Sequence, residues 1–219
     1  MKKIHLIESV ISFLASDNAG DLKGKYHPEE IKVWMSSAFN SIIYNAWING
    51  KKYSEFSQLD AWSKTYEIAV LSQVGTKAHA LLPFAPVQLS ENAGIRQIAD
   101  ANNSLNVFAP MEATAEVIFA ELEVNDADST PTYSLEQNNL NTGAGESSHL
   151  LRLEKLPTTT PISTIDVMMI VPFDQTDDFD DVAIPSGMEE NVISQVIELI
   201  SKKPMPDTTN DEVIRPQNQ

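Results

Sequence analysis

The stretch PEEIKVWMSSAFNSIIYNAW, residues 28–47, gives the clearest structural signal in the chain. Pro28 suits the first turn of a helix, and the two acidic residues after it complement the positive end of the helix dipole. Apolar residues then recur at three- and four-residue spacing and form one wide stripe. They are Ile31, Trp34, Met35, Ala38, Phe39, Ile42, Ile43, Ala46 and Trp47. The pattern predicts a long amphipathic helix that ends at Asn49-Gly50.

This apolar stripe contains two of the three tryptophans and must be covered by another surface. That surface could be another part of the chain, or the same helix of a neighbouring subunit. Burial inside the chain is the usual outcome for such a stripe. Because the pattern alone does not separate the two cases, Trp34, Phe39 and Trp47 are candidate contacts between subunits.

Two further helices are predicted, one near each end of the sequence. Residues 3–16 place apolar side chains on one side of a short amphipathic helix. Near the other end, Ser186 and Glu189 have the spacing of a capping box, which marks the start of a helix. Pro204 prevents that helix from continuing, and the polar, Pro-rich residues after it are expected to form an extended tail.

Between about residues 66 and 171 the hydrophobic period changes to two, with turn residues between the segments. The alternation is clearest in residues 115–124, where Ile118, Ala120, Leu122 and Val124 face one way. Further strands are expected at residues 67–74, 78–89, 150–156 and 165–171. The predicted fold class is therefore α+β, with N-terminal amphipathic helices, an antiparallel β-sandwich or barrel, and a C-terminal helix with an extended tail.

The patterns divide the chain into a helical region at 1–65, a β region at 66–172, and a region at 173–219 that holds an acidic loop, the last helix and the tail. Within the β region, residues 125–148 are rich in Asn, Ser, Thr and Gly. We expect a long polar loop here rather than a linker between domains. Tyr133 is the only aromatic residue in this loop, which makes it a candidate contact residue.

Composition limits the function. The chain has 31 acidic and 15 basic residues and a formal net charge of -16, which disfavours tight binding to nucleic-acid phosphates. It has no cysteine, as is natural for a protein made in a reducing cytoplasm. Two N-terminal lysines resemble the start of a signal peptide, but His5 and Glu8 interrupt the apolar run. No segment approaches the roughly 20 apolar residues that span a bilayer, so we expect a soluble protein without a membrane partner.

Two patterns suggest metal binding but lack the required spacing. The acidic run DQTDDFDD, residues 174–181, invites a calcium site. However, Phe179 stands where the calcium loop needs Gly, and Pro185 where it needs a bidentate Glu. A solvated acidic loop is the expected structure. The four histidines are far apart in the sequence, without the spacing of a zinc site.

Catalytic motifs are also missing from the sequence. Gly143 and Gly145 form a GxG, but a turn and a strand are expected after it instead of a phosphate-binding helix. No GxSxG, P-loop or SxxK sequence occurs. We therefore predict no catalytic residue, no metal ligand and no cofactor, and a protein that is not an enzyme.

Three stretches carry a resemblance to a known family. They are KAHALLPFAPVQLSENAGIRQI at 77–98, IPSGMEENVISQVIELI at 184–200 and KPMPDTTNDEV at 203–213. Together they resemble virion structural proteins of crAss-like phages that infect Bacteroidetes, in particular the ring or head-to-tail connector proteins between portal and tail. The resemblance covers most of the chain, and its last third is the most specific part.

The resemblance implies a structural subunit of the phage neck, assembled in the bacterial host cytoplasm and located in the virion. Its partners would be other copies of itself in a ring of about twelve-fold symmetry, where avidity multiplies modest contacts. Portal and other neck and tail proteins would be neighbours, and genomic DNA would pass as a non-specifically contacted duplex. The residues that match the family's last helix and closing motif are Pro185, Met188, Glu189, Pro206, Asp207, Asn210 and Asp211.

A different class of function stays open beside the connector. A monomeric β-sandwich module that binds a glycan or another surface ligand fits the predicted fold, because such folds present aromatic side chains on sheets or loops. Its only support in the long polar loop is Tyr133. A sandwich-fold hydrolase is a third possibility, for which no residue can be named.

Overall fold

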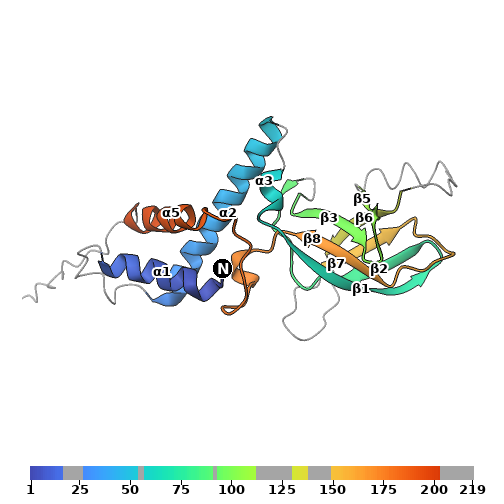
Figure 1. Cartoon of the computed structure of the whole chain (residues 1–219), viewed down its shortest axis with the longest axis horizontal. Coiled ribbons are helices and arrows are strands. Elements are labelled where there is room, and N and C mark those ends of the chain that lie inside the picture. Colours follow the sequence, from blue (N-terminus) through green and yellow to red (C-terminus); the bar gives the residue numbers. More distant parts are fainter. Residues whose placement is uncertain (17–26, 54–56, 91–92, 112–129, 138–148, 203–219) are drawn as a thin grey trace, which may run out of the picture.

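The computed structural model describes residues 1–16, 27–53, 57–90, 93–111, 130–137 and 149–202. These residues form two lobes side by side, one of helices and one of β-strands (Figure 1). The helical lobe contains α1 (Lys3–Ser16), α2 (Pro28–Tyr53), α3 (Ser57–Asp60) and α5 (Glu189–Lys202). The first and last of these pack against each other and against α2, so the two ends of the described chain meet in one lobe.

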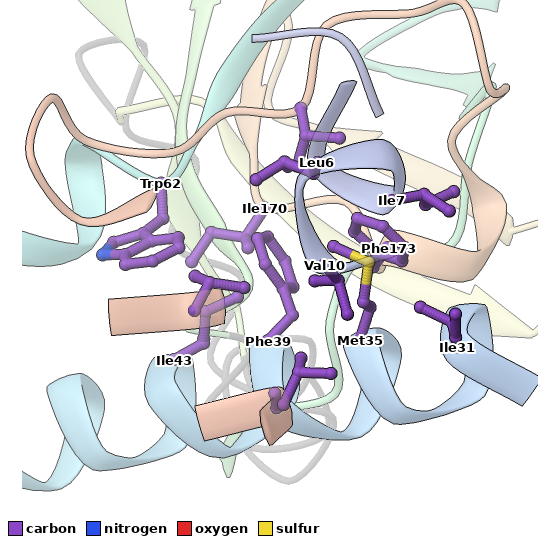
Figure 2. Packing of buried hydrophobic residues seen from close by; sticks show 14 of the residues in the cluster. Leu6, Ile7, Val10, Ile31, Met35, Phe39, Ile43, Trp62, Ile170 and Phe173 are labelled. Carbon is purple, nitrogen blue, oxygen red and sulfur yellow. The ribbon is translucent and has the colours of Figure 1, made fainter. Parts of the chain in front are cut away.

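The helical lobe has its own apolar core, which Figure 2 shows. Phe39 of α2 lies at its centre, with its ring 5.4 Å from Trp62 in an edge-to-face arrangement and 6.0 Å from Phe173. Trp62 lies two residues before the first strand, and Phe173 begins the short 3-10 helix η2 (Phe173–Gln175) that follows the last strand. The chain therefore enters and leaves the β lobe through residues that are part of the helical core.

The predicted helices exist, with two corrections at their ends. The bounds predicted for α1 are confirmed. However, α2 does not end at Asn49-Gly50: Gly50 is buried inside the helix, which continues to Tyr53. Basic residues in the last turn favour this extension, because they complement the negative end of the helix dipole.

The predicted capping box at the start of α5 is wrong. The helix begins at Glu189, three residues after Ser186. A turn closed by the Met188 N–H and the Pro185 carbonyl (3.0 Å) precedes it, with Gly187 at a φ of 85°. The Glu189 carboxylate accepts a hydrogen bond from the Gly187 N–H at 3.1 Å instead of bonding back to Ser186. The chain therefore enters α5 through a tight turn with a positive-φ glycine, and not through a cap at Ser186.

The β lobe is one eight-stranded sheet in the order β4-β3-β8-β1-β2-β7-β6-β5. The long strand β1 holds its two halves together: its first half pairs with β8, as in Tyr66 opposite Val167, and its second half pairs with β2, as in Val70 opposite Ala80. All pairs are antiparallel except β5 with β6. The strands are β1 (Lys64–Val74), β2 (Lys77–Leu81), β3 (Ile95–Asp100), β4 (Asn103–Val107), β5 (Ala109–Pro110), β6 (Thr132–Gln137), β7 (His149–Glu154) and β8 (Thr164–Met169).

One short segment brings the two edges of the sheet together. The edge strands β4 and β5 follow each other in the chain with only Phe108 between them. The Phe108 N–H donates to Ile98 on β3 (2.9 Å), whereas the Ala109 N–H donates to Pro131 beside β6 (2.8 Å). The sheet is therefore curled into a nearly closed barrel, and the α+β class with a barrel is confirmed.

Four strands agree with the sequence patterns and four were missed. β1, β2, β7 and β8 lie within or next to the predicted segments, although β2 ends at Leu81 well before residue 89. The predicted strand at 115–124 lies outside the described residues. The long polar loop predicted at 125–148 is corrected, because residues 132–137 form β6 in the middle of it.

Candidate contact surfaces

The C-terminal end of α2 carries an exposed group of aromatic and basic side chains. We call this group the α2 tip, and it consists of Tyr44, Trp47, Ile48, Lys51, Lys52 and Tyr53. Figure 1 shows this end of the helix projecting past α1 and α5. Tyr44, Ile48 and Tyr53 are 52%, 41% and 62% exposed. Exposed apolar side chains that gather in one place mark interaction sites more often than scattered ones do.

Ring contacts organise the α2 tip. The rings of Tyr44 and Trp47 are 5.7 Å apart. The Lys51 ammonium lies 5.2 Å from the Trp47 ring, and that of Lys52 lies 5.2 Å from the Tyr53 ring. Such cation–π contacts hold both the charge and the aromatic faces in place. The tip is therefore an amphipathic, positively charged end in a chain whose net charge is -16.

The acidic loop, residues 174–181, is attached to the start of α1 by its backbone. The carbonyls of Asp180 and Asp178 accept hydrogen bonds from the N–H groups of Lys3 (3.0 Å) and Ile4 (2.8 Å). These are among the N–H groups that a helix cannot satisfy internally at its first turn. The loop thus caps α1. The sequence pattern predicted a solvated loop and did not predict this contact.

Two lysines fix the acidic loop further. The Lys32 ammonium lies 2.8 Å from Asp178, and the buried Lys3 donates to the Thr176 carbonyl at 2.6 Å. The hydrogen bond from Lys32 lowers the pKa of Asp178, and the same bond raises the pKa of Lys32. Phe179 points out of this fixed loop and is 72% exposed. The loop is therefore a fixed acidic surface with one exposed aromatic ring.

A pocket of about 270 Å³ lies beside the first residues of β3 and β7. Its apolar lining includes Val87, Ile95 and Leu135, and its polar lining includes Gln88 and His149. The Nδ1 atom of His149 is buried without a hydrogen-bond partner among the described residues. The pocket has the mixed lining of a small-molecule site, and its volume is slightly below the usual range for such sites.

The residues predicted for contacts differ in their burial, and two of them lie in the protein core. Phe39 is fully buried in the helical core, and Tyr133 is only 5% exposed because it points into the barrel core from β6. Burial raises the pKa of the Tyr133 hydroxyl to about 12. Neither side chain reaches the surface, so the expectation of Tyr133 as a loop residue is wrong. Phe39 is core, which was the usual outcome for such a stripe.

The other predicted contact residues stay nearer the surface. Trp34 and Trp47 are half-buried against the helical core, and Pro185, Met188 and Glu189 are half-buried around the start of α5. Pro206, Asp207, Asn210 and Asp211 lie outside the described residues. Sequence reasoning missed Tyr44, Ile48 and Tyr53. Tyr44 and Ile48 were a visible signal, because they are apolar residues on the side of the predicted helix opposite its apolar stripe. Tyr53 lies beyond the predicted end of the helix at Asn49-Gly50.

In the part of the chain that the structure describes, no group of three or more His, Asp or Glu side chains is placed to hold a metal ion. No helix within those same residues is long and apolar enough to cross a membrane.

No protein-family model matches the sequence. No curated protein is significantly similar to it.

Proposed function

We propose that this chain is a structural subunit of a phage head-to-tail connector, the neck or adaptor between portal and tail. It acts by assembling with copies of itself into a ring of about twelve-fold symmetry, where many modest contacts add up through avidity. Its further partners are the portal protein and other neck and tail proteins. The ring belongs to the virion, is assembled in the bacterial host cytoplasm, and carries out no chemical reaction.

The observation that carries this proposal is the α2 tip. Tyr44, Ile48 and Tyr53 expose apolar surface at a projecting helix end, next to aromatic rings that lysines hold in place. An isolated monomer gains nothing from exposing these side chains, whereas a partner that covers them buries apolar area worth about 25 cal/mol per Å². Assembly is the function that this surface serves best.

Two further observations support the connector in particular. Three stretches of the sequence resemble ring proteins of crAss-like phages, including IPSGMEENVISQVIELI at 184–200, which covers most of α5. The net charge of -16 suits a channel wall, because a negative wall repels the DNA duplex and lets it slide through without binding. Genomic DNA is then a passing, non-specific contact.

The test is native mass spectrometry of the full chain over a concentration series, alone and with a portal protein encoded by a neighbouring gene. We expect one closed oligomer of fixed stoichiometry, alone or on the portal. A chain that stays monomeric under both conditions would contradict the proposal. Ring-shaped particles in negative-stain electron microscopy would support it independently.

A second candidate function is a monomeric module that binds a glycan or another surface ligand. The pocket beside β3 and β7 favours it, because the His149 Nδ1 atom is buried at a partly apolar cavity and has no hydrogen-bond partner among the residues that the structure describes. Tyr133 no longer supports it, since its ring lies in the barrel core.

A glycan array and a fragment screen by NMR would separate this module from the connector. The module predicts saturable binding by a monomer, with chemical-shift changes at His149 and Leu135. The connector predicts no such saturable ligand and a concentration-dependent rise in mass. A His149→Ala variant should lose ligand binding only if the module is correct.

A further inference from the structure

We propose that the α2 tip of one copy docks onto the acidic loop of the next copy, with Phe179 of that loop against the aromatic rings of the tip. This contact rests on the proposed function, because it names the two surfaces that would join neighbouring subunits in the ring. The partner is a second copy of this chain, and the two surfaces are different, so the contact is head-to-tail.

The two surfaces lie at opposite ends of the same helix. The acidic loop is fixed near the start of α2, because Asp178 pairs with Lys32 at 2.8 Å. The α2 tip is at the other end of this helix, at Tyr53. With a rise of 1.5 Å per residue, Lys32 and Tyr53 are about 30 Å apart along the axis. The tip therefore cannot reach the acidic loop of its own chain, but it can reach that of another copy.

The charges of the two surfaces are complementary. The α2 tip carries the ammonium groups of Lys51 and Lys52. In the acidic loop, Asp178 is engaged by lysines, whereas Asp174, Asp177 and Asp180 are exposed. In a chain with a net charge of -16, most surfaces of two copies repel each other. When the basic tip of one copy faces the acidic loop of the next, the charges at the contact attract each other.

The apolar parts of the two surfaces fit the same arrangement. Phe179 is 72% exposed and projects from a loop that hydrogen bonds to α1 hold in place. The α2 tip offers the rings of Tyr44 and Trp47, already 5.7 Å apart. Interfaces are commonly anchored by aromatic residues at the centre with charged residues at the rim. Phe179 would be such an anchor, with aspartates and lysines around it.

This arrangement has a consequence for symmetry. A contact between two different surfaces leaves one tip and one loop free at the two ends of any open chain of copies, so the next copy can always be added. The chain of copies ends only when the rotation closes into a ring. A ring is what the proposed function requires, whereas a contact between two identical tips would stop at a dimer.

The experiment uses two charge-reversed variants of the full chain. The first, Lys51→Glu with Lys52→Glu, makes the tip acidic, so that tip and loop repel each other between identical copies. The second, Asp177→Lys with Asp180→Lys, makes the loop basic, with the same result. In an equal mixture, the acidic tip of the first variant can face the basic loop of the second. The unchanged basic tip of the second variant can face the unchanged acidic loop of the first. Assembly should be lost in each variant alone and restored in the mixture.

Native mass spectrometry with one variant isotope-labelled reads the composition, and restored oligomers should contain the two variants in alternation. The matched control adds negative charge to the exposed β7–β8 loop, as Thr158→Asp, Thr159→Asp and Thr160→Asp, and should assemble like the original chain. A second variant, Phe179→Ala, should raise the concentration needed for assembly at least tenfold.

Each remaining outcome overturns the contact. If both charge-reversed variants assemble alone, the subunits join through other surfaces, and the connector proposal still stands. If each fails alone and the mixture also fails, the losses do not come from this pairing. If the original chain itself never assembles, alone or on a portal, both the contact and the proposed function are wrong.

Discussion

At the scale of single residues, Gly94 shows how tightly the junction between the lobes is packed. Its carbonyl accepts the Ile170 N–H at 2.9 Å, and the Ile170 carbonyl accepts the Val87 N–H at 2.9 Å. A Cβ atom at position 94 would lie 2.1 Å from the Val87 carbonyl oxygen. Because that oxygen belongs to the backbone, the two backbone segments that contain Val87 and Gly94 would have to move apart.

We therefore expect Gly94→Ala to lower the free energy of unfolding by about 3 kcal/mol, the upper part of the range for overpacking. Urea denaturation followed by circular dichroism would measure it. Gly75→Ala is the matched control: no atom lies within 4 Å of its Cβ, and only its φ of 61° is unfavourable, which costs about 1 kcal/mol. An equal loss at both positions would contradict the clash at Gly94.

The pair of Asp178 and Lys32 gives a pH-dependent contribution to stability. The hydrogen bond from Lys32 lowers the pKa of Asp178 below its ordinary value of 3.8. A carboxyl whose folded-state pKa is lowered stabilises the fold above its unfolded pKa, and this contribution is lost as the pH falls through the folded pKa. The loss should therefore occur below about pH 4. Because both side chains are partly exposed, solvent screens the pair and its contribution at neutral pH is small.

The variant Asp178→Asn should remove this contribution, so that the stability of the variant depends less on pH between about 2 and 4 than that of the original chain. Thermal unfolding in a series of acidic buffers would measure it. Asp177→Asn, in the same loop but exposed and without an ion pair among the described contacts, is the matched control. The same slope for both variants would mean that the Lys32 contact has no effect on stability.

At the scale of elements, the difference between α2 and β6 shows what the sequence alone can predict. In α2 the information is local: the apolar stripe, Pro28 and the acidic first turn all lie within the helix, and all could be read. In β6, residues 132–137 are TYSLEQ, with two apolar side chains among polar ones, inside a polar stretch. They form a strand because Tyr133 and Leu135 pair with Leu153 and Leu151 of β7. Because the partner strand lies elsewhere in the sequence, the local pattern of residues 132–137 does not predict the strand.

The same reason explains the contact surfaces. The acidic loop could be found as a run of charges, but its hydrogen bonds to α1 join residues far apart in the sequence and could not. Trp34 and Trp47 were named as contacts because they lie on the apolar stripe that another surface must cover, yet the more exposed aromatic residues on this helix are Tyr44 and Tyr53. The periodicity predicted which side of α2 is buried, but it does not show how far along the helix α1 and α5 cover it.

The core of the helical lobe gives a prediction for α2 as an element. Phe39 touches Trp62 from the entry to the barrel and Phe173 from its exit. Phe39→Ala would leave a cavity between three elements and should lower the free energy of unfolding by about 3–5 kcal/mol. Val33→Ala, 67% exposed on the same helix, should change it by less than about 0.5 kcal/mol. Chemical denaturation of both variants measures the difference, and equal effects would contradict the central place of Phe39.

At the scale of the whole molecule, two electrostatic effects act on assembly in opposite directions. Each copy carries a net charge of -16, so two copies repel each other over distances of tens of ångströms at low salt. The proposed contact between the α2 tip and the acidic loop is attractive, but its pairs act over only a few ångströms. Salt screens the long-range effect first, because the Debye length is about 30 Å at 0.01 M, 10 Å at 0.1 M and 3 Å at 1 M.

Assembly should therefore depend on salt with a maximum. From about 0.01 M to 0.15 M sodium chloride, screening removes the net repulsion while the Debye length still exceeds the contact distance, so the concentration needed for assembly should fall. Towards about 1 M the pairs of Lys51 and Lys52 with the loop aspartates are themselves screened, and that concentration should rise again. Light scattering over a salt series measures both the fall and the later rise of the concentration needed for assembly. The tip variant Lys51→Glu with Lys52→Glu should not assemble at about 0.15 M salt, and more salt should only favour its assembly, because salt screens the repulsion between its acidic tip and the acidic loop. A continuous fall up to 1 M in the original chain would mean that apolar burial alone holds the copies together and that the charges of the α2 tip have no part in it.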